Sequence, residues 1–418
     1  ADTRRGTMSE LSHGITRRLF TLGAATSIAI RSRAASAQGD AVRIGEINSY
    51  SRLPAFTLPY RKAMQMAVAE INDGGGIGSM GGRPLDIIFR DDGGSPIDAV
   101  RACEDLLTRQ KVHFLAGTFL SNVALAVANY AARNKTMFLA TEPLSDELTL
   151  AGGNRYTFRL RSNLHMLTGM LVDRVKDRGA RRWAIVAPNY EYGTGAAEAF
   201  KIWLQRADPT ASIVIEQYPA LGRVDTPSTL SAIERAKPDG IFNALFGTDL
   251  VQLVRDGQLR GTFSNRIVAS LITGEPEYLL PLGDETPEGW IVTGYPWDQV
   301  GWGWHKRFVA QYIRQFADTP RFGSFLGYLA AFVMRDILEA AGSTDTERLI
   351  EATAGRTFKT IAGNITIRDV DHQSTLGAWV GETKVASGNP GMINWRYVEG
   401  TSYMHAEDDV RRLRKSAQ

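Results

Sequence analysis

Apolar and polar positions form a regular alternation of strand-like and helix-like segments that begins at residue 42. Residues 42–47 alternate as in a strand, and the apolar residues from Met64 to Ile71 recur at the three- and four-residue spacing of an amphipathic helix. Further strands are expected at 85–89, 112–116 and 137–140, with helices at 97–110 and 123–133 between them. Strands separated by helices predict a parallel sheet with right-handed crossovers.

A second series of the same kind follows the polar stretch 152–162. We expect helices at 164–178, 196–205, 226–236 and 249–257, and strands at 183–187, 212–217, 240–245 and 266–269. Two consecutive units of this kind predict two doubly wound α/β lobes, in which ligands bind beyond the carboxyl ends of the strands. Later helices at 304–316 and 325–341, and short strands near 364–368, 378–380 and 395–398, are expected to complete the lobes.

The first 37 residues differ from the rest of the chain in charge. They hold six arginines against two acidic residues, a net charge of +4, whereas the whole chain has +3 and the remainder therefore −1. The body of the protein thus lacks the basic bias that favours nucleic-acid binding. Arg17 and Arg18 precede an apolar run at 22–30 and an Ala-x-Ala motif ending at Ala37, which is the order of a cleavable export signal. The adjacent arginines favour a twin-arginine signal over a general secretory one, with cleavage near Ala37 and a periplasmic location.

The sequence lacks the motifs of several common enzyme classes. The phosphate-binding loop, the nucleophile elbow and the zinc-protease motif do not occur, and the six histidines are scattered. The single cysteine, Cys103, excludes a disulfide framework. Gly193 and Gly195 follow a predicted strand, but Glu198 stands where a dinucleotide-binding loop has its third glycine. We therefore expect no catalytic residues, no cofactor and no metal.

Five stretches together resemble the type I periplasmic solute-binding proteins of ABC transporters, in the leucine/isoleucine/valine-binding group. They are Ala-Glu-Ile-Asn at 69–72 with the glycine-rich run 74–78, Phe-Arg-Asp-Asp at 89–92, the segment 114–126, Asn-Tyr-Glu-Tyr-Gly at 189–193 and Asp-His-Gln at 371–373. The resemblance implies two Rossmann-like lobes joined by a three-strand hinge, with a ligand cleft between them that closes by hinge bending. It also implies two partners, a small-molecule ligand and the membrane permease of an ABC importer.

This resemblance divides the chain into four parts. Residues 1–37 are the export signal. Lobe one is expected to comprise 41–161 with 296–362, and lobe two 162–295 with 363–400. The last part, 401–418, is a C-terminal tail.

In lobe one, the expected ligand contacts lie in two loops. Ser121 precedes the predicted helix 123–133, where free amide groups and a hydroxyl suit a carboxylate, although Ser121 could also be a plain N-cap. The resemblance implies that Ser121 holds the ligand carboxylate, with Leu120 and Asn122 replacing a common threonine and glycine. Glu142 and Leu144 lie in the next loop, where Glu142 could bind a ligand amino or hydroxyl group. Alternatively, Glu142 could pair with a nearby arginine, Arg159 or Arg161.

In lobe two, the resemblance implies contacts from three loops. Tyr192 matches the ligand-binding tyrosine of the group. The loop after the next cleft strand supplies Phe246, Thr248 and Asp249, and the third loop supplies Thr273 and Glu275. Glu275 is expected to pair with a ligand ammonium. Its alternative role is to cap or begin a short helix at 276–280.

The predicted function is capture of a small amino acid or related carboxylate for an ABC importer. Leu120, Asn122 and Glu142 depart from the pattern of the amino-acid binders, so aromatic carboxylates and small amides are alternative ligands. The alternative from another class, an exported α/β enzyme, requires acid–base or nucleophilic groups that converge in the cleft.

Overall fold

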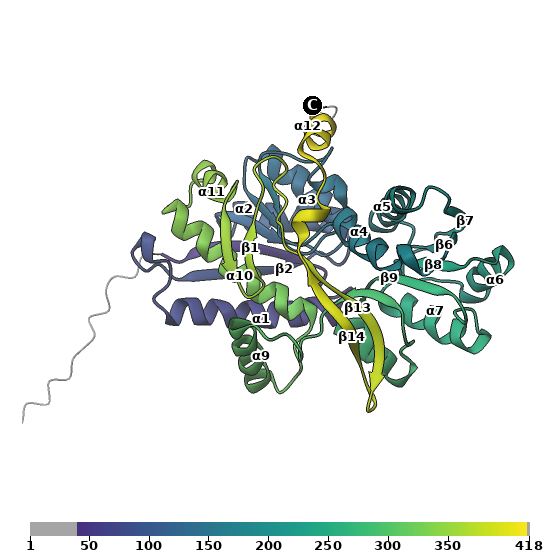
Figure 1. Ribbon diagram of the computed structural model, residues 1–418. Helices are drawn as coiled ribbons and strands as arrows, with labels where there is room; N and C mark the ends of the chain where they lie inside the picture. The colour runs from purple at the N-terminus through teal and green to yellow at the C-terminus, as the bar shows by residue number, and fades with distance from the viewer. Residues whose placement is uncertain (1–39, 416–418) are drawn as a thin grey trace, which may run out of the picture. The chain divides into compact units, whose positions relative to one another are not determined.

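A computed structural model describes residues 40–415 (Figure 1). The predicted export signal at 1–37 lies outside the described residues. Within them, the parallel strands of two separate sheets confirm the predicted α/β architecture. We call each sheet with its flanking helices a lobe.

The first sheet has five parallel strands in the order β2-β1-β3-β4-β5. Its strands are β1 (Val42–Asn48), β2 (Leu85–Asp91), β3 (Phe114–Gly117), β4 (Phe138–Ala140) and β5 (Thr157–Arg159), and its helices are α1 (Pro54–Asp73), α2 (Pro96–Thr108) and α3 (Ser121–Arg133). The sequence predicted the first four strands and missed β5. Phe158 is the one strongly apolar residue of β5, which makes its local pattern too short to distinguish from a loop.

The second sheet has seven strands in the order β14-β13-β10-β9-β8-β6-β7. Its strands are β6 (Arg182–Val186), β7 (Ser212–Gln217), β8 (Gly240–Asn243), β9 (Ile267–Gly274), β10 (Ile291–Gly294), β13 (Ala378–Ala386) and β14 (Asn389–Val398). The intervening helices are α4 (Leu164–Val175), α5 (Glu191–Ala207), α6 (Thr226–Ala236), α7 (Gly247–Arg260) and α8 (Pro276–Leu282). Strands β6 to β10 are parallel to one another, whereas β13 and β14 add an antiparallel edge.

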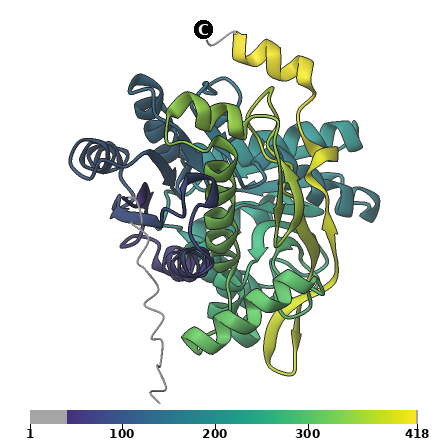
Figure 2. The same ribbon diagram turned by 90° about the vertical axis from the view of Figure 1, so that its left-hand side faces the viewer.

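The antiparallel edge corrects the sequence prediction. The sequence did not predict β10, and it predicted only short pieces of β13 and β14, which form one long hairpin that is yellow in both views (Figure 1, Figure 2). Pairing between distant segments stabilises these strands, since β10 pairs with β13 about 90 residues later. The periodicity of a short segment does not show which distant segment it pairs with.

The C-terminal third returns to the first lobe through its helices. It contains α9 (Gly303–Phe316), α10 (Phe322–Ala341), α11 (Thr346–Thr353), the hairpin β11 (Thr357–Thr360) and β12 (Gly363–Thr366), and α12 (Glu407–Lys415). Helix α10 packs along α1. At Gly327, an added Cβ would lie 2.1 Å from the carbonyl oxygen of Tyr60, so this close helix contact requires glycine.

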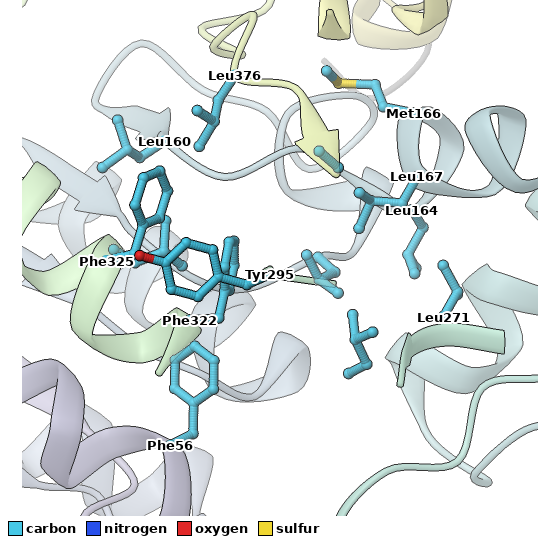
Figure 3. Close-up of a cluster of buried hydrophobic side chains, with 14 of the residues drawn as sticks. Phe56, Leu160, Leu164, Met166, Leu167, Leu271, Tyr295, Phe322, Phe325 and Leu376 are labelled. Carbon is cyan, nitrogen blue, oxygen red and sulfur yellow. The ribbon is translucent and has the colours of Figure 1, made fainter. Parts of the chain in front are cut away.

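The chain crosses between the two sheets three times, at 160–163, 295–302 and 367–377. The third crossing pairs with the end of β5 and with the first crossing that follows it: the Arg159 amide donates to the His372 carbonyl at 2.9 Å, and the Ser374 hydroxyl donates to the Leu160 carbonyl at 2.5 Å. Leu160, Tyr295 and Leu376, one from each crossing, lie in the same buried apolar cluster (Figure 3). The three connections therefore share one core, as a three-strand hinge requires.

Candidate functional site

Loops from both sheets converge on a small cavity of about 10 Å³. Its lining residues are Phe119, Ser121, Glu142, Leu144, Arg161, Tyr190, Tyr192, Phe246 and Ile272. Apart from Ile272, which lies near the end of β9, these residues follow the carboxyl ends of parallel strands β3, β4, β5, β6 and β8. This is the edge at which open α/β sheets bind ligands. A cavity of this volume has room for about one water molecule.

The structure brings together some of the predicted ligand contacts and separates others. Ser121, Glu142, Leu144, Tyr192 and Phe246 line the small cavity. Leu120, Thr248 and Asp249, again with Phe246, line a neighbouring cavity of about 300 Å³. Glu275 lines another cavity of about 10 Å³, which it shares with Arg161. Asn122 and Thr273 are not among the residues that line these three cavities.

The residues at the edge of this group have bonds within the protein. Asp249 accepts hydrogen bonds from the amides of Gly222 at 2.6 Å and Val224 at 3.2 Å, so its carboxylate holds the loop before α6. The Thr273 hydroxyl lies 2.6 Å from that of Ser270. These contacts give Asp249 and Thr273 structural roles in the described conformation.

Ser121 is the first residue of α3 and does not cap it. Leu120 occupies the N-cap position, and no side chain makes a capping bond there. The Ser121 hydroxyl instead accepts a hydrogen bond from the amide of Ser145 at 3.2 Å, which ties the loop after β4 to the start of α3. The N-cap alternative for Ser121 is therefore wrong.

Arg161 and Glu275 form a buried ion pair at the junction of the lobes. Their side chains are 4% and 3% exposed, and the guanidinium donates through Nη2 to Glu275 Oε1. The guanidinium also lies over the ring of Phe322, 4.5 Å from its centroid. Burial raises the pKa of Glu275 to about 8, and the charge of Arg161 opposes that rise.

The pairing of Glu275 settles one alternative and identifies a residue that the sequence analysis considered only as a partner for Glu142. Glu275 occupies the N-cap position of α8 but makes no capping bond, so the capping role is wrong. Arg161 lines two cavities and follows β5. A cation just beyond a cleft strand would have indicated a site residue, but the local sequence pattern does not predict β5.

A chain of buried polar groups lies beneath the cavity in lobe one. Asn48 donates through Nδ2 to Glu142 Oε1 at 2.7 Å and to Glu46 Oε1 at 3.2 Å. The hydroxyl of Tyr50 donates to the other oxygen of Glu46. Burial raises the pKa of Glu46 to about 8. Burial and the charge of Glu46 hold the pKa of Glu142 well above its usual range.

These bonds decide the alternatives for Glu142. Among the ion pairs of residues 40–415, neither Arg159 nor Arg161 is paired with Glu142. Arg159 donates instead to Gln373 Oε1 at 2.5 Å and to Thr149 Oγ1 at 2.7 Å. The salt-bridge alternative is therefore wrong. The sequence held a signal for this cluster, because Glu46 and Asn48 are polar residues on one face of a strand in a parallel sheet.

Unpartnered polar atoms gather at the cavities. Glu142 Oε2, the Tyr192 hydroxyl and Glu275 Oε2 are buried and have no hydrogen-bond partner within the part of the chain that the structure describes. Most buried polar groups in proteins are paired, so this grouping indicates a place where a ligand completes the bonding.

Backbone strain is found at the same place. Ile272 has φ +53° and Thr118 has φ +66°, values that β-branched residues rarely adopt. Gly117, at φ +106°, precedes Thr118, and an added Cβ would lie 2.5 Å from Glu46 Oε1. Strained residues of this kind persist where the surrounding structure holds them, often at binding sites.

Two properties of the described residues bear on other kinds of function. Within 40–415, no group of three or more His, Cys, Asp or Glu side chains is arranged to hold a metal ion. No helix of the same part of the chain is long and apolar enough to span a membrane.

Comparison with known proteins identifies the family. Residues 41–389 match the family model described as periplasmic binding protein. The chain belongs to this periplasmic binding protein family. The resemblance inferred from the five sequence stretches is therefore confirmed.

Curated and solved relatives agree with this membership. The periplasmic binding protein described here is 22% identical over 313 residues to a leucine-, isoleucine-, valine-, threonine- and alanine-binding protein of Pseudomonas aeruginosa, covering 73% of this chain and 79% of the relative. A periplasmic binding protein from Burkholderia mallei matches its fold with a TM-score of 0.79 at 19% identity, covering 89% of this chain and 98% of the other. An ABC-transporter solute-binding protein from Rhodopseudomonas palustris BisB5, solved with 3,4-dihydroxybenzoic acid, matches with a TM-score of 0.77 at 20% identity, over 87% and 98% of the chains. Their shared fold confirms the predicted type I architecture.

Proposed function

We propose that this protein captures a small amino acid or a related carboxylate in the cleft between its lobes and delivers it to the membrane permease of an ABC importer. The observation that carries the proposal is the convergence of strand ends from both sheets on a cavity lined by unpartnered buried polar atoms. The Pseudomonas aeruginosa relative is named as an amino-acid binder and the Rhodopseudomonas palustris neighbour as a solute-binding protein of an ABC transporter. Both support binding over the exported-enzyme alternative.

Ligand entry on this proposal requires the lobes to separate. The central cavity holds about one water molecule, and an amino acid is several times larger. Contacts across the cleft, such as the Ser145 hydroxyl donating to Glu191 at 2.6 Å, must break as the lobes open. We propose that the three crossings act as the hinge for this motion.

Aromatic carboxylates are a second candidate ligand class on the same site. Phe246 lies at the centre of an aromatic group, with ring centroids 6.0 Å from Phe119 and 5.6 Å from Tyr192. Such rings provide offset and edge contacts to a bound aromatic ring. The neighbour solved with 3,4-dihydroxybenzoic acid supports this class.

We expect Tyr192→Ala and Ser121→Ala to weaken ligand binding. Thermal-shift measurements with L-amino acids, benzoates and small amides would first identify a ligand, because a ligand at 100 times its Kd adds about 2.7 kcal/mol of stability. Removing the Ser121 hydroxyl should then raise the Kd roughly 2- to 100-fold, the range for one neutral or charge-assisted hydrogen bond. Losing the Tyr192 ring should raise the Kd at least ~10-fold. Calorimetric titration measures both effects.

The control for this experiment is Tyr130→Ala, which removes a tyrosine on α3 that lines none of the three cavities. Its Kd should equal that of the wild type. Small-angle scattering of the wild type should show a smaller radius of gyration at saturating ligand if the lobes close on it. Wild-type affinity in both site variants would show that the cleft is misplaced, and an unchanged scattering curve would rule out hinge closure.

We also propose that residues 1–37 direct export through the twin-arginine pathway and are then removed. The arginine pair, the apolar run at 22–30 and the motif ending at Ala37 support this proposal. Changing both Arg17 and Arg18 to lysine should leave the precursor in the cytoplasm, as measured by fractionation and immunoblotting. Processing at the normal rate in the double variant would exclude the twin-arginine route.

A further inference from the structure

At the cleft, one carboxyl oxygen of Glu142 has hydrogen-bond partners within residues 40–415 and the other has none there. Its side chain is buried, with the residue only 1% exposed, and it lines the central cavity beside Ser121 and Tyr192. Oε1 accepts hydrogen bonds from Asn48 at 2.7 Å and from the Thr141 hydroxyl at 3.5 Å. Oε2 has no partner among the described residues. A buried carboxyl oxygen without a partner is costly, so its retention at a cavity points to a partner that arrives with the ligand. Burial raises the pKa of Glu142 and so favours its protonated form without a ligand, whereas a donor that reaches Oε2, an ammonium above all, favours the ionised form.

The polar chain beneath the cavity fixes the orientation of that oxygen. Asn48 is itself held on both sides, because its Oδ1 accepts from the Ser49 amide at 2.9 Å while its Nδ2 bridges Glu142 and Glu46. Thr141, which also contacts Glu142, lies 3.0 Å from the hydroxyl of Tyr60. Asn48 is thus a positioning residue that directs the free oxygen of Glu142 away from its own amide.

The acid of lobe two already has a charge partner. Glu275 Oε1 pairs with Arg161, so the carboxylate that sequence resemblance assigns to a ligand ammonium has a protein cation beside it, although its Oε2, like that of Glu142, is unbonded within the described part of the chain. The lining of the central cavity then combines groups that favour an anion, the Arg161 guanidinium and the start of α3 at Ser121, with one free acceptor, Glu142. A ligand that matches this lining has a carboxylate at one end and a hydrogen-bond donor at the other.

We propose that Glu142 Oε2 accepts a hydrogen bond from the ligand, and that the ligand is a small carboxylate with a separate donor group, either an ammonium or a hydroxyl. This inference rests on the proposed function. It moves recognition of the donor from Glu275 in lobe two to Glu142 in lobe one. It also explains why Glu142 remains buried and only half bonded in the described conformation.

Two matched pairs of probes test the proposal by calorimetric titration. L-leucine and 4-methylpentanoate differ by an ammonium, and 3,4-dihydroxybenzoate and benzoate differ by two hydroxyls. The wild type should bind the donor-bearing member of at least one pair ~10-fold or more tightly than its partner compound. In Glu142→Met, which removes the acceptor, this preference should fall below ~3-fold. In Glu275→Gln, the preference should remain.

Glu142→Gln distinguishes an ammonium donor from a hydroxyl donor. It also tests the role of Glu142 if Glu142→Met does not fold. Because Asn48 donates at Oε1, the glutamine should keep its oxygen there and place its amide nitrogen where Oε2 was. That nitrogen should abolish a preference for ammonium, whereas a hydroxyl can turn to accept from it and should keep part of its preference.

The outcomes distinguish this inference from the proposed function. A wild-type preference that is unchanged in both Glu142 variants, or that disappears in Glu275→Gln, overturns the role of Glu142 while binding itself stands. A wild type that binds the probes without preferring either donor-bearing compound overturns it as well. Binding of none of the four probes overturns the proposed ligand class and this inference together.

Discussion

At pH values above about 8, Arg161→Met is expected to destabilise the folded protein by roughly 3–5 kcal/mol, because it leaves the ionised carboxylate of Glu275 buried without its cation. The change also removes the guanidinium from the ring of Phe322. The effect should be largest above pH 8, where Glu275, whose pKa burial raises to about 8, is ionised. Chemical denaturation of the ligand-free protein measures the free energy of unfolding in both proteins.

A surface ion pair provides the matched control for Arg161. Arg255 and Glu285 pair at 2.7 Å but are 46% and 49% exposed, so Arg255→Met should cost at most about 1 kcal/mol. The double variant Arg161→Met with Glu275→Gln should recover much of the lost stability, because no unpaired charge remains. Equal losses for Arg161→Met and Arg255→Met, or a double variant no more stable than the single one, would contradict the role assigned to the pair.

Glu46→Gln is expected to make the protein more stable than the wild type at high pH, by roughly 3–5 kcal/mol. Burial raises the pKa of Glu46 from an ordinary value of 4.5 to about 8 in the folded protein. Between these values the folded state keeps a proton that the unfolded state has lost. Wild-type stability therefore falls as pH rises from 4.5 to 8 and levels off above it. Glutamine has no such proton, so the advantage of the variant should be small below pH 4.5 and complete above pH 8.

The measurement is the difference in unfolding free energy between variant and wild type across this pH range. Using the difference cancels the contributions of the buried histidines, which titrate in both proteins. Glutamine preserves the local bonding, because its oxygen can accept from Asn48 and its nitrogen can donate to the Tyr50 hydroxyl. Glu104→Gln makes the same substitution at an exposed position and is the control. A flat difference for Glu46→Gln would show that its carboxyl titrates normally in the folded protein.

The sequence by itself determined most of the strands and helices of the two lobes, with β5 and β10 missed, and the edge at which a ligand would bind. The spacing of apolar residues within a segment predicts its structure, because each strand and helix buries the face on which its apolar residues lie. Ser121 was found in this way, because it follows a strand whose end must lie at the cleft. Tyr192 and Phe246 were expected from the family resemblance, and all three residues line the central cavity. Family resemblance gave the two lobes, which the fold confirms, and the hinge motion, which stays a proposal.

Only the tertiary structure decided how the charged groups pair. Arg161 meets Glu275 from 114 residues away, and Asn48 meets Glu142 from 94 residues away, distances along the chain over which no local pattern operates. The capping role for Glu275 and the salt bridge for Glu142 were both sound local interpretations. Burial overrode them, because a carboxylate removed from water binds whichever donor the fold places within reach, and that placement is a property of the packed lobes.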